Sequence, residues 1–158
     1  MVLYKNLDVG CGAFLPEKKE KDWLYLDVVP FPNIDVVRDL EKGLPFGDET
    51  FERIKAHHII EHLKDLIFVM NEFWRVLKKD GVLDIAVPAG VNTWIDPTHI
   101  RAIGPHGLDF FQVEDFNSLN AGVVGFFDRI ELKAVAHNGD TGDIRGYNFL
   151  LRKREAKK

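Results

Sequence analysis

The chain has 158 residues, of which 46% are hydrophobic and 29% charged, with a formal net charge of −4. This composition predicts one globular domain with a sizeable core, and the acidic balance argues against duplex nucleic acid as a partner. The single cysteine excludes an intramolecular disulfide and a cysteine-rich metal site. We expect no membrane partner and a cytoplasmic protein, because no segment has the length of a membrane span and residues 1–5 do not begin a signal sequence.

Short β-rich runs alternate with polar or helical stretches, and this alternation favours an α/β fold. The predicted strands are residues 6–10, 24–28, 34–38, 53–57, 82–87, 129–136 and 147–152. We expect one sheet in which the first five strands are parallel. The last two strands flank a turn-rich segment, 138–143, and are predicted to form a hairpin that adds an antiparallel edge.

The first predicted strand runs directly into a glycine turn, Leu7-Asp8-Val9-Gly10-Cys11-Gly12. Glycine permits left-handed dihedral angles and lets a cofactor approach the backbone, although a Gly-x-Gly alone also fits an ordinary turn. Cys11 fits there as a small residue that keeps the turn tight, the alternative being a reactive thiol. Asp27, at the end of the second strand, favours a ligand because an acid there can accept hydrogen bonds from a ribose. A dinucleotide fingerprint needs a third glycine where Leu15 stands, so an adenosine ligand without a pyrophosphate is favoured over NAD.

The connections between the early strands are too short for full crossover helices. Residues 13–22 contain a proline and a charged run, and only residues 29–33 join the second and third strands. Parallel neighbours normally need a dozen or more residues, so either the third strand bends away or the chain crosses without a helix. A sheet left bare on one face would expose apolar side chains, with Phe14, Trp23 and Phe31 at hand, and a homodimer would cover them.

One long helix is predicted from Leu66, Met70, Phe73 and Leu77, which recur at helical spacing, with Asp65 as the N-cap. Asp80-Gly81 is expected to end this helix. A second helix is predicted over residues 107–116. The basic run at residues 153–158 is expected to be a solvated tail without a function.

Five sequence pieces occur in one order: the glycine turn, the Asp27 strand, Leu44-Pro45-Phe46 with Phe51-Glu52, Glu61-His62-Leu63, and residues 75–81. In this the chain resembles class I S-adenosylmethionine-dependent methyltransferases, and it is most similar to the small type 11 branch. The resemblance is close over residues 6–90. It implies a single Rossmann-like domain over residues 1–158 with reduced early helices, and S-adenosylmethionine as the cofactor.

The resemblance also implies which residues hold the cofactor. The turn after the first strand would lie under the methionine part, Asp27 would bind the ribose, and Asp39 would accept from the adenine amine. The residues assigned to the cofactor in this way are Asp8, Gly10, Cys11, Gly12, Asp27, Val28, Asp39, Leu40 and His57.

Methyl transfer is a direct displacement, so an enzyme mainly aligns the acceptor, and a histidine base helps where the acceptor is a hydroxyl. The segment Asp96-Pro97-Thr98-His99 is the substrate-side candidate, and the residues assigned to catalysis are His58, Asp96 and His99. Alternatively, Asp96 and His99 only lock their loop through mutual hydrogen bonds. No metal is predicted: His58 and His62 stand at i and i+4, but His58 is expected to end a strand instead of sharing a helix with His62.

The sequence thus predicts a methyltransferase that transfers a methyl group in line to an unidentified acceptor, expected to be a small molecule. The alternative is a catalytically silent module that binds S-adenosylmethionine and acts through protein partners. An NAD-dependent oxidoreductase is a third hypothesis, which the missing glycine disfavours.

Overall fold

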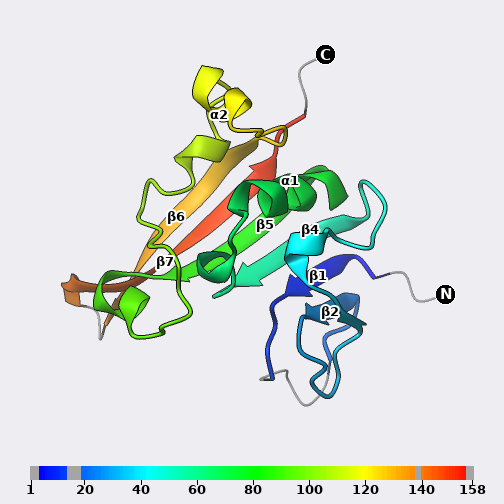
Figure 1. Cartoon of the computed structure of the whole chain (residues 1–158), viewed down its shortest axis with the longest axis horizontal. Coiled ribbons are helices and arrows are strands. Elements are labelled where there is room, and N and C mark those ends of the chain that lie inside the picture. Colours follow the sequence, from blue (N-terminus) through cyan, green and yellow to red (C-terminus); the bar gives the residue numbers. More distant parts are fainter. Residues whose placement is uncertain (1–3, 14–18, 138–139, 156–158) are drawn as a thin grey trace.

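The computed structural model describes residues 4–13, 19–137 and 140–155 (Figure 1). The strands are β1 (Asn6–Val9), β2 (Trp23–Asp27), β3 (Val36–Val37), β4 (Phe51–His57), β5 (Leu77–Pro88), β6 (Phe127–His137) and β7 (Asp140–Lys153). The α-helices are α1 (Leu66–Val76) and α2 (Phe116–Asn120). Four short 3₁₀ helices are η1 (Leu40–Lys42), η2 (Ile60–His62), η3 (Gly90–Trp94) and η4 (Asp109–Phe111). No helix within these residues is long and apolar enough to cross a membrane.

All seven strands form one sheet in the order β3-β2-β1-β4-β5-β7-β6. Strands β1 to β5 are parallel to one another, whereas β7 pairs antiparallel with both β5 and β6. The predicted α/β sheet, mostly parallel with an antiparallel pair at one end, is confirmed. The chain moves outward from β1 to β3 and then returns to place β4 on the other side of β1. Ligands bind at such a reversal, outside the carboxyl ends of the strands.

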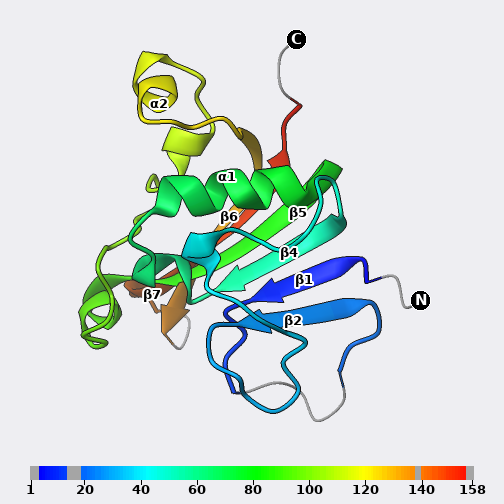
Figure 2. The same ribbon diagram turned by 45° about the vertical axis from the view of Figure 1, so that its right-hand side comes forward.

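Helix α1 lies across one side of the sheet (Figure 2). It begins after Asp65, whose carboxylate accepts a hydrogen bond of 2.9 Å from the Phe68 N–H, as the sequence predicted. One stripe of the helix, Val69, Met70, Phe73 and Val76, is fully buried in the core that also contains Leu7, Ile54 and Leu83. This apolar packing holds the helix on the sheet.

Helix α1 is shorter than predicted. It ends at Val76, because Leu77 already pairs with Phe51 as the first residue of β5. Asp80 has a left-handed φ of +57°, and the regular pairing resumes where Val82 meets Arg53. The Asp80-Gly81 turn therefore lies in an irregular part of β5 and does not end the helix.

The helix predicted over residues 107–116 is wrong. Residues 109–111 form η4, and α2 begins only at Phe116. The reason is Asp115, which is extended and caps α2: its carboxylate accepts from the Ser118 N–H, and the Ser118 hydroxyl accepts from the Asp115 N–H. This capping box starts a helix where the sequence pattern predicted that one would end.

The basic run is not a solvated tail at its first two residues. The Lys153 ammonium is buried, donates to the Leu77 carbonyl at 2.7 Å, and lies 4.3 Å from the Trp74 ring centre. Burial lowers the pKa of Lys153. The Arg154 guanidinium donates to the Asp128 carboxylate at 2.6 Å. Strand β7 thus continues through Lys153, while residues 156–158 lie outside the described part of the chain.

The chain crosses from β2 to β3 without a helix, which resolves the two alternatives. Leu26 pairs with Val36 and Asp27 with Val37, so β3 stays in the sheet, and Val28 to Asp35 connect the two strands. The turn is stabilised by Asp35, whose carboxylate accepts from the Tyr25 N–H at 2.9 Å and from the Lys19 ammonium at 2.5 Å.

The sheet face opposite α1 is charged, contrary to the apolar surface expected there. Strand alternation directs Asp8, Lys55 and His57 away from the core residues that alternate with them. The Lys55 ammonium donates to the Asp8 carboxylate at 2.9 Å, and Asp84 pairs with both His57 and Arg53. Trp23 and Phe31 are half-buried, and Phe14 lies outside the described residues. The homodimer was predicted because a bare sheet face would expose apolar side chains. The centre of this face is charged instead, so that reason does not hold, and the homodimer stays a prediction.

Candidate cofactor site

A pocket of about 230 Å³ lies at the carboxyl ends of the first four strands. It is lined by Gly10, Leu26, Asp27, Val28, Arg38, Asp39, Leu40, Ile59, His62 and Leu63. Five of these residues were assigned to the cofactor from the sequence: Gly10, Asp27, Val28, Asp39 and Leu40. The sheet brings them together because parallel strands end at the same edge, at the reversal of strand order between β1 and β4.

The glycine turn after β1 has two left-handed residues, Gly10 at φ +64° and Gly12 at φ +66°. A Cβ on Gly10 would lie 2.6 Å from Cγ1 of Ile59, so the turn needs glycine there to pack against the segment that follows β4. No described atom lies within 4 Å of the position that a Cβ on Gly12 would take. The backbone at Gly12 is therefore open to a ligand.

Asp27 connects the glycine turn after β1 with the turn that follows β2. Its carboxylate is 7% exposed and accepts from the Gly12 N–H at 2.8 Å through Oδ2 and from the Val29 N–H at 2.9 Å through Oδ1. A carboxylate has about four lone-pair positions. Asp27 can therefore fix the turn and still accept hydrogen bonds from a ligand.

Asp39 and Leu40 follow β3 and form another wall of the pocket. Asp39 caps η1 by accepting from the Glu41 N–H at 3.0 Å, which holds the start of this short helix at the strand end. Leu40 is buried and, with Leu26 and Leu63, supplies apolar surface. The pocket thus combines an apolar wall with two carboxylates.

Cys11 lies inside the turn with its Sγ 3.4 Å from the Leu26 carbonyl. Burial, with smaller effects from Asp8 and Asp27, raises the pKa of this thiol to about 12. A thiol that stays protonated at neutral pH is a poor nucleophile. The geometry thus favours the small-residue interpretation of Cys11 over the reactive thiol.

Asp8 and His57 do not line the pocket. The Asp8 carboxylate is 5% exposed and bound to Lys55, and burial raises its pKa against the opposing effect of that ammonium. His57 Nε2 lies 3.1 Å from Oδ1 of Asp84. Both side chains belong to the charged face of the sheet.

The three residues assigned to catalysis lie near one another but do not form the predicted Asp96–His99 hydrogen bond. His99 Nε2 is 4.0 Å from the Asp96 carboxylate, and His99 Nδ1 instead donates to the Thr93 carbonyl at 2.7 Å. Asp96 accepts from the hydroxyl and the backbone N–H of Thr98, at 2.6 and 2.8 Å. Each side chain therefore holds part of the loop through Thr93 or Thr98, and not through the mutual hydrogen bonds of the alternative.

His58 is the most exposed member of this group. It follows β4 at a left-handed φ of +53°, its side chain is 66% exposed, and its Nδ1 lies 3.7 Å from Oε1 of Glu61. The Glu61 carboxylate raises the pKa of His58. His58 is thus free to meet an acceptor, whereas the His99 side chain, 9% exposed, is not.

Sequence reasoning missed five pocket residues: Leu26, Arg38, Ile59, His62 and Leu63. Three of them lie in the segment after β4, which the sequence singled out only as Glu61-His62-Leu63. The signal that could have found them is Gly10, since a glycine at a close approach implies a bulky neighbour, here Ile59.

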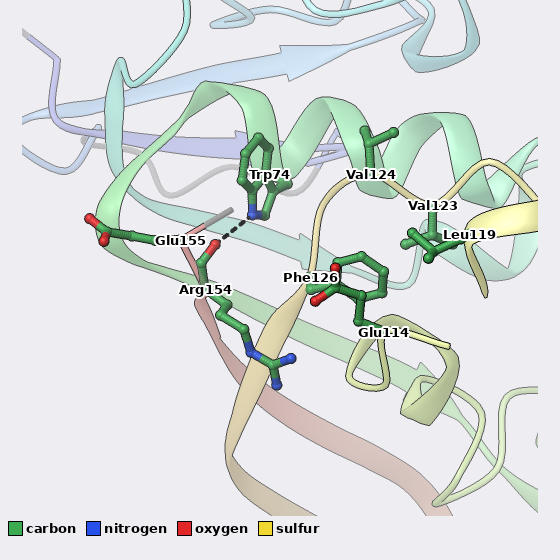
Figure 3. Close-up of a pocket in the computed structure, with 8 residues that line it drawn as sticks. All are labelled: Trp74, Glu114, Leu119, Val123, Val124, Phe126, Arg154 and Glu155. Atoms are coloured by element: carbon green, nitrogen blue, oxygen red, sulfur yellow. Dashed lines mark hydrogen bonds between the residues drawn. The ribbon is translucent and has the colours of Figure 1, made fainter. Parts of the chain in front are cut away.

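A second pocket, of about 250 Å³, lies elsewhere (Figure 3). It is lined by Trp74, Glu114, Leu119, Val123, Val124, Phe126, Arg154 and Glu155, and the Trp74 N–H donates to the Arg154 carbonyl at 2.9 Å. None of the residues assigned to catalysis or the cofactor borders it. The pocket at the strand ends is therefore the candidate site.

Comparisons with known proteins agree with this fold. The type 11 family model, described as a methyltransferase domain, matches residues 17–85, which include Asp27 and Asp39 and begin after the glycine turn. A crystal structure of an S-adenosylmethionine-dependent methyltransferase from Archaeoglobus fulgidus superposes with a TM-score of 0.69 at 18% identity, covering 94% of this chain and 86% of that one. The chain has the class I methyltransferase fold. The predicted resemblance to S-adenosylmethionine-dependent methyltransferases is confirmed.

Two further methyltransferases are similar over different lengths. The N-methyltransferase NodS of Bradyrhizobium japonicum, crystallised with S-adenosyl-L-homocysteine, superposes with a TM-score of 0.59 at 15% identity, covering 96% of this chain and 78% of that one. The sterol 24-C-methyltransferase erg6 of Schizosaccharomyces pombe is 30% identical over 109 residues, 56% of this chain and 27% of that enzyme. The curated relatives that match are covered over 24% to 39% of their length.

Proposed function

We propose that the chain is a methyltransferase that binds S-adenosylmethionine in the pocket at the strand ends and transfers its methyl group to a small-molecule acceptor. The observation that carries this proposal is the meeting, in one pocket, of the turn after β1, Asp27 at the end of β2 and Asp39 after β3. The family match and the superpositions support methyl transfer over the silent module.

The residues of the pocket fit the cofactor part by part. Asp27 has lone pairs for the ribose hydroxyls, and Asp39 would accept from the adenine amine beside the apolar surface of Leu40. The volume of about 230 Å³ is below the range of roughly 300–1,000 Å³ for sites that enclose a whole drug-sized ligand. We therefore assign the pocket to the nucleoside part, and the open backbone at Gly12 to the methionine part.

Bound S-adenosylmethionine would supply a methyl group on a sulfonium: the acceptor's lone pair would bond to the methyl carbon as the carbon–sulfur bond breaks, and S-adenosylhomocysteine would leave. The chain's task is to align the acceptor and exclude water. We assign to His58 the removal of the acceptor's proton, because its imidazole is exposed next to the pocket residue Ile59. Asp96 and His99 are assigned to holding the loop after β5 over the acceptor.

Ligand titration followed by turnover tests this function. We expect S-adenosylmethionine and S-adenosylhomocysteine to bind one per chain and NAD not to bind. A panel of small hydroxyl and amine acceptors, scored by released S-adenosylhomocysteine, then separates an enzyme from a silent module. Binding of NAD without either adenosyl ligand would refute the assigned cofactor, and adenosyl binding without release from any acceptor would favour the silent module.

The assignment of His58 is tested by substitution on any acceptor that responds. His58→Ala should lower kcat by about 100-fold or more if the base contributes in the usual range, with the affinity for S-adenosylhomocysteine unchanged. His106→Ala is the matched control, because His106 is exposed and pairs with Asp109 away from the pocket. Full activity in His58→Ala would remove the base from this position.

A further inference from the structure

We propose that Glu61, His62 and His99 form a binding site for one divalent transition-metal ion at the wall of the cofactor pocket. One potential ligand atom from each residue lies within 4.8 Å of the other two. The sequence predicted no metal, because His58 and His62 do not share an α-helix. The fold instead brings His99, from the segment after β5, against the short helix η2 that carries Glu61 and His62.

Glu61 provides the strongest reason to expect a cation. Its carboxylate is 1% exposed, and within the described residues neither oxygen has a hydrogen-bond partner. The nearest imidazole nitrogens, of His58 and His99, are 3.7 and 3.9 Å from Oε1, too far for hydrogen bonds. A buried carboxylate without hydrogen bonds is costly, and coordination of a metal ion removes that cost.

His99 is oriented as a metal ligand. Its Nδ1 lies 2.7 Å from the Thr93 carbonyl, which can only accept, so Nδ1 carries the proton. The lone pair is therefore on Nε2, the atom that lies 3.9 Å from Glu61 Oε1. Metal-binding histidines commonly donate their other N–H to a backbone carbonyl in this way.

His62 is oriented by a longer chain of hydrogen bonds. The Thr98 hydroxyl donates its single proton to Asp96 at 2.6 Å, so at 3.0 Å it accepts from His62 Nδ1. This leaves the lone pair of His62 on Nε2. Asp96 thereby fixes the tautomer of His62 through Thr98, as an outer-shell carboxylate does in many zinc sites.

The donor set selects the class of ion. Two imidazoles and one carboxylate with open positions are typical of catalytic Zn²⁺ and of non-haem Fe²⁺, whereas Ca²⁺ and Mg²⁺ prefer oxygen ligands. Ligand atoms around a tetrahedral Zn²⁺ lie about 3.4 Å apart, as follows from bonds of roughly 2.1 Å. The potential ligand atoms of Glu61, His62 and His99 lie within 4.8 Å of one another, so side-chain movements that bring them closer together would complete the site.

The position of the site links it to the proposed function. Since His62 also lines the cofactor pocket, the ion would lie beside the place where the acceptor approaches. An open coordination position could then bind an acceptor oxygen. That role rests on the proposed function, but the binding of the ion itself does not, because it is measured without S-adenosylmethionine.

The test uses Co²⁺ and Zn²⁺ on the full chain freed of metal by a chelator. We expect one Co²⁺ per chain with visible absorption of a low-symmetry site, displacement by Zn²⁺, and at least 10-fold weaker binding in Glu61→Gln and His99→Gln. Thr98→Val should weaken binding about 10-fold through the orientation of His62. His106→Ala should bind as the unchanged chain does, since His106 pairs with Asp109 outside the cluster.

The absence of stoichiometric Co²⁺ and Zn²⁺ binding by the unchanged chain would overturn the proposal, and so would unchanged affinity in folded Glu61→Gln. Circular dichroism of each metal-free variant establishes that it is folded. His62→Gln gives the same readout on a partly exposed side chain, so the test does not depend on Glu61→Gln folding.

Discussion

The two faces of the sheet differ in how their side chains are accommodated: one face is apolar and packs against α1, and the other is charged. On one face, Ile54 and Ala56 of β4 are buried with α1 in the apolar core. On the other face, the alternate residues Lys55 and His57 make ion pairs with Asp8 and Asp84. The connections from β1 to β3 do not supply α-helices within the described residues, and charged side chains take the place of the apolar ones that such helices would cover. A parallel sheet can therefore lack helices on one face when charged side chains make that face suitable for contact with water.

The largest effect on stability is expected in the apolar core on the α1 face of the sheet. Phe73→Ala should lower the free energy of unfolding by about 3–5 kcal/mol, because the Phe73 side chain of α1 is fully buried in the core and its removal leaves a cavity. Urea denaturation measures this loss. Phe110→Ala is the control: Phe110 is 39% exposed, and we expect a loss below about 1 kcal/mol. Equal losses in the two variants would contradict the assignment of the core to the α1 face.

A smaller effect is expected where α1 holds the loop before β4. The Arg75 guanidinium donates to the Leu44 and Phe46 carbonyls and to Glu72, at 3.1, 2.8 and 2.6 Å. Arg75→Ala should cost about 1–2 kcal/mol, since partly exposed bonds of this kind are weakened by solvent. Thermal denaturation compares it with Arg145→Ala, whose guanidinium pairs with Asp143 at an exposed position and should have no measurable effect. If Arg75→Ala also left the melting temperature unchanged, the Arg75 hydrogen bonds to the loop before β4 would not stabilise the fold.

The smallest effect is expected on the charged face, and it should depend on pH. His57, with a further effect from Arg53, lowers the pKa of Asp84 below its ordinary value of 3.8. The folded state therefore gains stability from ionised Asp84 above pH 3.8 and loses it as the pH falls through the lower, folded-state pKa. Asp84→Asn should cost less than about 1 kcal/mol near pH 7, because water screens the pair, and this difference should shrink below about pH 4.

Urea denaturation of the unchanged chain and Asp84→Asn at several pH values checks this prediction. A difference that grew as the pH fell would show that the sign is wrong.

Much of the fold was predictable from local patterns. The seven strands, the parallel order of the first five and the Asp65 cap follow from apolar runs, turn residues and capping chemistry. The charged face could also have been predicted from the alternation Arg53-Ile54-Lys55-Ala56-His57. The short connections between the early strands led instead to the prediction of an exposed apolar face. Element ends were wrong where tertiary pairing prevailed, as at Leu77, or where a cap lay inside an apolar stretch, as at Asp115.

The candidate site could be predicted from the sequence only for residues at the ends of strands. Gly10, Asp27 and Asp39 each lie at or just after the end of a strand and could be placed at one edge. The approach of His99 to Glu61 could not, because it depends on how the segment after β5 folds back on η2, and the Ile100 N–H bond to the Glu61 carbonyl that holds it has no sequence signature.

We propose that the pocket at the strand ends binds the adenosyl cofactor over the Gly12 backbone, and a calorimetric comparison of two glycine variants tests this claim. Gly12 and Gly122 both have left-handed φ angles, +66° and +91°, and both have open space at the Cβ position, so alanine strains either backbone similarly. We predict that Gly12→Ala weakens S-adenosylhomocysteine binding at least 10-fold, while Gly122→Ala, away from the pocket, binds as the unchanged chain does. Equal affinity in the two folded variants would contradict the claim.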